Sequence, residues 1–214
     1  MRSSFSIVVL ISGSGSNLQS IIDAITATQL NAHLSAVISN NANAYGLKRA
    51  QQHNIATHII DHKQFDSREG FDQELQNVID QYQPDLVVLA GFMRILTAPF
   101  VQHYYGKMLN IHPSLLPAYK GIHTHQRVLE QGEKIHGVSV HFVTAELDGG
   151  PVIAQARVAV HRDDDVTALA QRVLKQEHRI YPTVIQWFIE QRLCLVEGKV
   201  YFDHAIQQKP IEYQ

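Results

Sequence analysis

Residues 5–18 read FSIVVLISGSGSNL, and this stretch decides the fold. Its first seven residues form a nearly continuous apolar run, which is typical of a strand buried on both faces of a parallel sheet. Beyond the glycine-rich turn, apolar residues recur at a helical spacing at Leu18, Ile21, Ile22 and Ile25. The stretch therefore predicts a strand, a glycine loop and a helix in direct succession, with the helix over residues 17–26.

The same alternation continues through the first half of the chain. The pattern predicts further strands at residues 34–39, 55–60 and 86–90, and helices at 45–53 and 68–82. Strands that alternate with helices in this way form a parallel sheet with right-handed crossovers.

The character of the sequence changes after His112. There the pattern predicts strands at 137–143 and 151–160, a helix over 166–190 that Pro182 kinks or divides, and a terminal hairpin over 193–202. We therefore expect an α/β fold with a Rossmann-like, mostly parallel sheet flanked by helices and an antiparallel element in the C-terminal half. No linker or repeat appears, so we expect a single domain over residues 1–214, with halves at about 5–112 and 113–214.

Composition limits the classes of partner. The 214 residues are 45% hydrophobic and 18% charged, with a formal net charge of −2, which gives no electrostatic reason to expect nucleic acid or an anionic membrane. No apolar run reaches the roughly 18 residues of a membrane helix, and residues 1–6 are too short and polar to begin a signal peptide. Cys194 is the single cysteine, which favours a reducing compartment and a cytoplasmic location. The sequence leaves open whether the chain forms a homodimer.

The loop SGSGSN at residues 12–17 is a candidate anion site. Glycine lets the backbone approach an anion, and the following helix N-terminus supplies N–H donors. A dinucleotide fingerprint would need glycine at Leu18 and an acid near Asn40, and the Lys-Ser/Thr of a Walker loop is missing. The loop therefore fits a small phosphate monoester better than NAD or ATP. The alternative is a tight turn with Ser16 or Asn17 as the helix cap.

The stretch NIHPSLLP at residues 110–117 carries the strongest chemical signal. The apolar residues before it continue a strand, and Pro113 ends that strand, so Asn110 and His112 emerge on one side. Two hydrogen-bond donors at the carboxyl edge of a strand suit negative charge that develops on an acyl oxygen. A polar strand end before a proline turn is the alternative.

Three other groups of polar residues have both a chemical and an ordinary interpretation. In the glycine-flanked loop at residues 144–150, Asp148 could charge and orient His112, or the loop could be a solvated turn. His123 and His125 suggest a metal pair, yet no His-Glu-x-x-His helix or cysteine cluster is present, and they could bind loop carbonyls instead. His141, in a strand, reads as a satisfied core residue.

The loop GFMRIL at residues 91–96 follows the central strand, at the edge where open α/β sheets bind ligands. An apolar loop with one arginine suits a flat heteroaromatic ligand that carries carboxylates, and ordinary packing is the alternative. Arg68 at a helix start could meet an anion or be solvated. Glu177 sits mid-helix, where a solvent-facing position is the default.

Six stretches occur in order between residues 7 and 187: VVLISGSGSNLQ, LAGFMRIL, NIHPSLLP, GIHTH, HFVTAELDGGPVI and QEHRIYP. Together they resemble the phosphoribosylglycinamide formyltransferases, folate-dependent enzymes of purine synthesis. The resemblance implies transfer of a formyl group from the co-substrate 10-formyltetrahydrofolate to the amine of glycinamide ribonucleotide, without a metal. The chain departs from the family pattern at Ser14 and Leu174.

The resemblance also implies roles for individual residues. Catalysis would fall to Asn110, His112 and Asp148, with His112 as the proton donor. Ribonucleotide contacts would come from the first loop and from two residues farther along the chain: Gly15, Ser16, Asn17, Leu18, Gln19, Asn110 and Glu177. Folate contacts would come from three segments: Arg68; Met93, Arg94, Ile95 and Leu96; and Thr144, Ala145, Glu146, Leu147 and Asp148.

Other folate enzymes that share the Asn-x-His core are the nearest alternatives. A methionyl-tRNA formyltransferase would carry a further basic carboxy-terminal domain, and a formyltetrahydrofolate deformylase would carry a regulatory domain before the first strand, where only six residues precede Ile7. A non-catalytic nucleotide-binding module would use the glycine loop but leaves Asn110, His112 and Asp148 unexplained.

Overall fold

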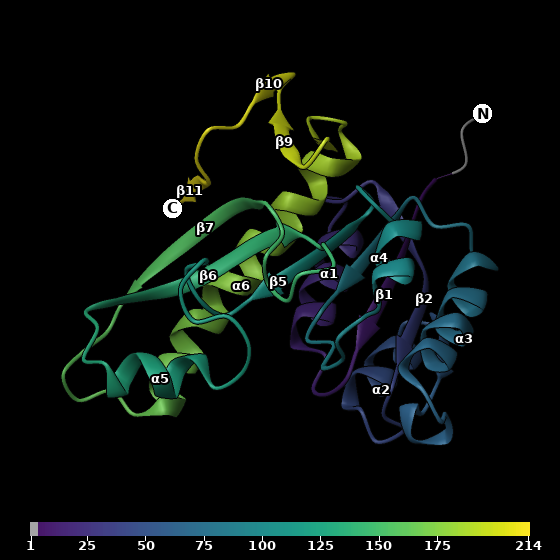
Figure 1. The fold of residues 1–214 in the computed structure, drawn as a ribbon, viewed down its shortest axis with the longest axis horizontal. Helices are drawn as coiled ribbons and strands as arrows, with labels where there is room; N and C mark the ends of the chain where they lie inside the picture. Colours follow the sequence, from purple (N-terminus) through teal and green to yellow (C-terminus); the bar gives the residue numbers. More distant parts are fainter. Residues whose placement is uncertain (1–3) are drawn as a thin grey trace. The chain divides into compact units, whose positions relative to one another are not determined.

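The computed structural model describes residues 4–214 and has a Rossmann-like α/β fold (Figure 1). Eight strands belong to a mostly parallel sheet, and three further strands form a small antiparallel sheet. This confirms the fold class expected from the sequence. The expected domain and the polar stretch of residues 1–6 both include residues 1–3. These three residues lie outside the described part of the chain. The chain divides into two compact units, Met1–Leu109 and Asn110–Gln214.

Unit 1 is a parallel sheet with helices. Its strands are hydrogen-bonded in the order β4-β1-β2-β3, and every adjacent pair is parallel. Residues 7–11 of the central strand are fully buried, as the apolar run predicts. The elements of unit 1 are β1 (Phe5–Ile11), α1 (Ser16–Thr26), β2 (Ala32–Ser39), α2 (Tyr45–Gln52), β3 (Ala56–Ile59), the 3-10 turn η1 (His62–Gln64), α3 (Arg68–Asp80), β4 (Leu86–Leu89) and α4 (Ala98–His103).

The helix starts of unit 1 differ in how they are capped. The Ser67 side chain accepts a hydrogen bond from the backbone N–H of Gly70 (3.0 Å) and so caps α3. At α1 the cap residue is Gly15, in a left-handed conformation (φ 68°), and it makes no side-chain capping hydrogen bond. The alternative in which Ser16 or Asn17 caps this helix is therefore wrong.

Unit 2 contains the antiparallel element. β6 and β7 pair antiparallel, and β11 lies parallel to β7. Helix α6 packs against both β6 and β7 and contacts α5. The elements are β5 (Met108–His112), whose first two residues belong to unit 1, then α5 (Thr124–Glu130), β6 (Ile135–Phe142), β7 (Val152–Ala159), α6 (Val166–Ile189), β8 (Leu193–Val196), β9 (Lys199–Phe202), β10 (Ala205–Ile206) and β11 (Ile211–Tyr213).

Two expectations for the last third of the chain need correction. Pro182 lies inside α6 and does not divide it. Fully buried residues flank it, among them Tyr181 and Val184, and their packing offsets the hydrogen bond that proline removes. The hairpin of β8 and β9 is confirmed but is not terminal, because β10 and β11 follow; strands of two and three residues are too short to show periodicity. Within residues 4–214, no helix has the length and apolar character to cross a membrane.

Candidate active site

Asn110 and His112 stand at the end of β5, as the sequence predicts. The strand ends at His112, and the backbone N–H of Ser114 donates to the His112 carbonyl at 2.8 Å, so the chain turns directly after Pro113. Alternation along the strand puts the two side chains on one side. His112 is buried, and Asn110 is partly exposed.

The amide of Asn110 is oriented by His141 on β6. Nδ1 of His141 lies 2.8 Å from the carbonyl oxygen of Phe142, so this nitrogen carries the proton. Burial lowers the pKa of His141, which keeps the imidazole neutral and leaves Nε2 as an acceptor. Nδ2 of Asn110 donates to this Nε2 at 3.1 Å. Within the described residues, the second N–H of the same amide has no hydrogen-bond partner.

Asp148 lies beside His112. Its Oδ2 is 3.5 Å from His112 Nδ1, and its side chain is only 9% exposed. The backbone N–H of Gly121 donates to the same carboxylate oxygen at 2.8 Å. Nε2 of His112 donates to the carbonyl of Tyr119 at 2.9 Å, and within residues 4–214 no hydrogen bond reaches His112 Nδ1. The imidazole is thus held through one nitrogen, while the other faces a carboxylate.

The glycines after Asp148 allow the loop to fold back at this point. A Cβ atom at Gly150 would collide with the carbonyl oxygen of Phe142, so only glycine fits there. Asp148 itself has a left-handed backbone (φ 46°). Glu146 differs from Asp148, because its side chain is 69% exposed and pairs with Lys120 at 2.7 Å. The interpretation as a solvated turn therefore suits Glu146 and not Asp148.

Within unit 1, the glycine loop and the loop after β4 are in contact through Ser12. The hydroxyl of Ser12 donates to Asn40 Oδ1 (2.6 Å) and accepts from the backbone N–H of Met93 (2.7 Å). The Ser12 N–H also donates to the Gly91 carbonyl at 3.1 Å. The glycine loop and the loop after β4 therefore meet at the carboxyl edge of the parallel strands, the usual ligand edge of such sheets.

The glycine loop packs closely on α2, and the guanidinium of Arg49 on α2 bonds to it. A Cβ atom at Gly15 would lie 2.5 Å from the Cα of Gly46. Nε of Arg49 donates to the Ser14 carbonyl at 2.9 Å, and its Nη1 donates to Gln19 Oε1 at 3.2 Å. None of the ion pairs found within residues 4–214 involves Arg49, so its charge stays available to an anion at this loop.

The loop after β4 exposes apolar side chains beside a buried donor. Met93 is 66% exposed and Ile95 is 47% exposed, whereas Leu96 is buried. The guanidinium of Arg94 lies 5.9 Å from the ring centre of Phe71, and its buried Nε has no hydrogen-bond partner within the described residues. A buried N–H without an acceptor is costly, which makes this atom a candidate ligand contact.

The remaining predicted residues differ in burial and in their contacts. Leu18 is fully buried in α1 and Glu177 is buried on α6, against the solvent-facing default for Glu177. Arg68 is exposed at the start of α3. His125 does not bind a loop carbonyl: its Nδ1 lies 3.0 Å from Nε2 of His136. Thr144, Ala145 and Leu147 precede Asp148 in the loop between β6 and β7.

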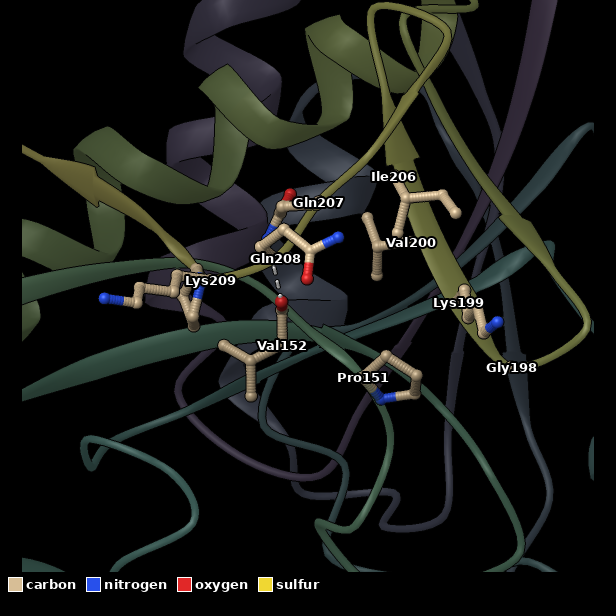
Figure 2. Close-up of a pocket in the computed structure, with 10 residues that line it drawn as sticks. Pro151, Val152, Gly198, Lys199, Val200, Ile206, Gln207, Gln208 and Lys209 are labelled. Carbon is tan, nitrogen blue, oxygen red and sulfur yellow. Dashed lines mark hydrogen bonds between the residues drawn. The ribbon is translucent and has the colours of Figure 1, made fainter.

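A cavity elsewhere in unit 2 contains none of the predicted site residues (Figure 2). Its volume is about 430 Å³, and it is lined by the start of β7, by β9 and by the segment that leads to β11. The Gln207 amide in its wall donates to the carbonyls of Val152 (3.1 Å) and Ile153 (2.9 Å). These bonds tie the C-terminal segment to β7.

Comparison with known proteins identifies the family. The family model described as formyl transferase matches residues 5–185. The chain belongs to the formyl transferase family. Within this family it is 57% identical to the phosphoribosylglycinamide formyltransferase of Escherichia coli strain K12, over 92% of this chain and 93% of that protein.

Solved structures of formyl transferases agree with the fold. The phosphoribosylglycinamide formyltransferase of Coxiella burnetii, in complex with CHES, is 52% identical, with a TM-score of 0.95 over 99% of this chain and 100% of that one. A formyltetrahydrofolate deformylase from Pseudomonas syringae is 25% identical, with a TM-score of 0.86, and this chain covers 66% of its length. The likeness is therefore greater to the transferase.

The sequence did not reveal that His141 orients Asn110, or that the loop from Tyr119 to Gly121 contacts His112 and Asp148. Ser139 and His141 are two residues apart on β6, so both lie on one face of this buried strand. Two polar residues on one buried face could have indicated that His141 belongs to the site. The contacts of Tyr119 and Gly121 with His112 and Asp148 are made by backbone atoms, so no residue type signals them.

Proposed function

We propose that the chain is an enzyme that transfers the formyl group of 10-formyltetrahydrofolate to the amine of glycinamide ribonucleotide, a step of purine biosynthesis. The cluster of His112, Asp148 and the Asn110–His141 pair carries this proposal. It combines a cation-forming imidazole with a fixed amide donor, and 57% identity to the Escherichia coli transferase supports the same chemistry.

His112 and Asp148 together stabilise the charge that develops on the substrate during the reaction. When the amine attacks the formyl carbon, negative charge develops on the formyl oxygen. Nδ1 of His112 lies 3.5 Å from the Asp148 carboxylate, which places a negative charge beside the ring that is proposed to stabilise this oxygen. The carbonyl of Tyr119 holds Nε2 and so fixes the plane of the ring. His112 is the proton donor in this scheme.

Asn110 supplies the second donor. His141 takes one N–H of its amide, so the other N–H has a fixed direction toward the side of β5 that His112 shares. A donor that needs no reorientation during the reaction stabilises developing charge more than a mobile one.

The ribonucleotide phosphate would bind at the glycine loop. Gly15, Ser16, Asn17, Leu18 and Gln19 begin α1, whose first turn no side chain caps. Helix N-terminal amides and the positive end of the helix dipole favour an anion there. Arg49, which donates to the neutral oxygens of Ser14 and Gln19, adds a positive charge. Asn110 and Glu177 are proposed as further ribonucleotide contacts.

The residues of the loop after β4 fit a folate. Met93 and Ile95 offer exposed apolar surface to a pteridine ring, and the buried Nε of Arg94 needs an acceptor that the ligand can provide. We assign the folate also to Arg68, Leu96 and residues 144–148. When bound, the folate supplies the activated formyl group.

The reaction balances without a metal or a covalent enzyme intermediate. The new bond joins the ribonucleotide nitrogen to the formyl carbon, and the bond from that carbon to the folate nitrogen breaks. One proton leaves the amine and one reaches the folate nitrogen, so a proton must be relayed, and water is a sufficient carrier. We propose a metal-free reaction and a cytoplasmic location, in keeping with the lone Cys194.

A formyl-transfer assay tests the proposal. Purified protein is given both substrates without metal or nucleoside triphosphate, and formylated ribonucleotide is measured together with free formate. Ribonucleotide-dependent transfer is expected. Formate release without ribonucleotide would indicate a deformylase, binding without turnover would indicate a nucleotide-binding module, and activity lost to a chelator and restored by zinc would contradict the metal-free reaction.

A further inference from the structure

The segment from Tyr119 to Ile122 forms part of the catalytic cluster through its backbone. The Tyr119 carbonyl accepts the Nε2 proton of His112 at 2.9 Å, and the Gly121 N–H donates to Asp148 at 2.8 Å. Both members of the charged pair therefore depend on where this segment lies. A shift of about 1 Å in such contacts is enough to impair catalysis.

The backbone of this segment does not hold its shape by local preference. Tyr119 (φ 55°) and His123 (φ 58°) are left-handed although they are not glycines, and Gly121 has φ 81°. A left-handed backbone is unfavourable for a residue that carries a side chain. The segment therefore needs contacts from outside to keep this conformation.

Arg127, in the last turn of α5, makes these contacts. Its Nη1 donates to the Lys120 carbonyl at 2.7 Å and lies 3.5 Å from the Ile122 carbonyl. Its guanidinium also lies 5.3 Å from the centre of the Tyr119 ring. One planar cation thus touches three successive parts of the segment, a geometry that lysine cannot reproduce.

The other side-chain contacts of the segment are weaker restraints. The Tyr119 hydroxyl donates to Glu133 at 2.9 Å, which fixes the end of the ring and not the carbonyl. Lys120 pairs with Glu146 at 2.7 Å, but Glu146 is largely exposed, and exposed ion pairs stabilise a chain segment only weakly. Apart from His112 and Asp148 themselves, Arg127 is the residue whose side chain bonds the backbone carbonyls of this segment within residues 4–214.

We propose that Arg127 is a positioning residue for the reaction. It holds the segment so that the Tyr119 carbonyl keeps the Nε2 proton of His112 and the Gly121 N–H keeps Asp148 in place. In this arrangement Nδ1 of His112 stays beside the Asp148 carboxylate. The inference rests on the proposed function only for its kinetic consequence, because the orientation of His112 can be measured without substrate.

The test compares Arg127→Met with Arg127→Lys and with a matched control. Arg172→Met is the control, because Arg172 also holds a backbone carbonyl, that of Ala159 at 2.9 Å, but on α6 away from the cluster. We measure kcat and KM for both substrates, the melting temperature, and the ¹⁵N signals of His112. Arg127→Met should lower kcat about tenfold or more, with KM for the ribonucleotide changed less than twofold. Arg127→Lys should restore part of kcat.

The His112 spectrum separates positioning from general stability. In Arg127→Met the Nε2 signal should lose the character of a hydrogen-bonded N–H, and in Arg172→Met it should not move. An unchanged kcat and spectrum in Arg127→Met would overturn the inference, as would a kcat that falls equally in the control. If Arg127→Met does not fold, the same two readouts on Arg127→Lys decide. A wild-type protein that transfers no formyl group, but whose His112 signal responds to Arg127→Met, would refute the proposed function and leave the positioning role intact.

Discussion

Replacing Asp148 by asparagine tests the central charge interaction of the site. Asn keeps an oxygen for the Gly121 N–H and nearly the same volume, so the loop should stay folded while the negative charge is lost. His112 Nδ1 lies 3.5 Å from the carboxylate, and at an effective dielectric constant of about 20 this separation corresponds to roughly 5 kcal/mol. The amide dipole and water replace part of that attraction.

We therefore expect a loss of about 3 kcal/mol of transition-state stabilisation, which lowers kcat roughly a hundredfold. The ribonucleotide KM should change little, because Asp148 is not among its proposed contacts.

Asp203→Asn is the matched control. Asp203 also pairs closely, with Arg192 at 2.7 Å, but lies outside every proposed site, so its loss should leave kcat within twofold. Near-normal turnover in Asp148→Asn would remove Asp148 from the mechanism and leave it as a turn residue.

Three further outcomes are expected. Gly15→Val should lower the melting temperature, because a Cβ atom there meets the backbone of Gly46. A Cβ atom at Gly13 meets open space, so Gly13→Ala should raise the ribonucleotide KM at an unchanged melting temperature. An equal rise of KM for both substrates would mean that the loop is only a turn. Met93→Asp should leave stability intact, since the side chain is 66% exposed, but should weaken folate binding in a titration, where the ring would cover the charge. Burial lowers the pKa of His136 to about 4, so between about pH 6.5 and 4 the unfolded chain binds more protons than the folded one. The free energy of unfolding should therefore fall as the pH drops through that range. In His136→Gln, urea titrations at several pH values should show a smaller dependence of this free energy on pH.

The sequence alone determined the repeating units of the fold and part of the site. A strand buried on both faces must be apolar throughout, so β1 and β4 were evident as short apolar runs. Side-chain alternation placed Asn110 and His112 on one side of a strand that Pro113 ends. These features depend on neighbours in sequence, and local patterns carry them.

Only the tertiary structure decided which distant groups complete the site. The neutral tautomer of His141 depends on its burial and on the Phe142 carbonyl, and its bond to Asn110 joins two strands. The Tyr119 carbonyl that His112 bonds and the Lys120 carbonyl that Arg127 bonds are backbone atoms, which every residue type carries. β11 pairs with β7 more than fifty residues away, and its three residues are too few for a pattern. Residue type and spacing reveal a side chain's chemistry, but hydrogen-bond partners and burial exist only once the chain has folded.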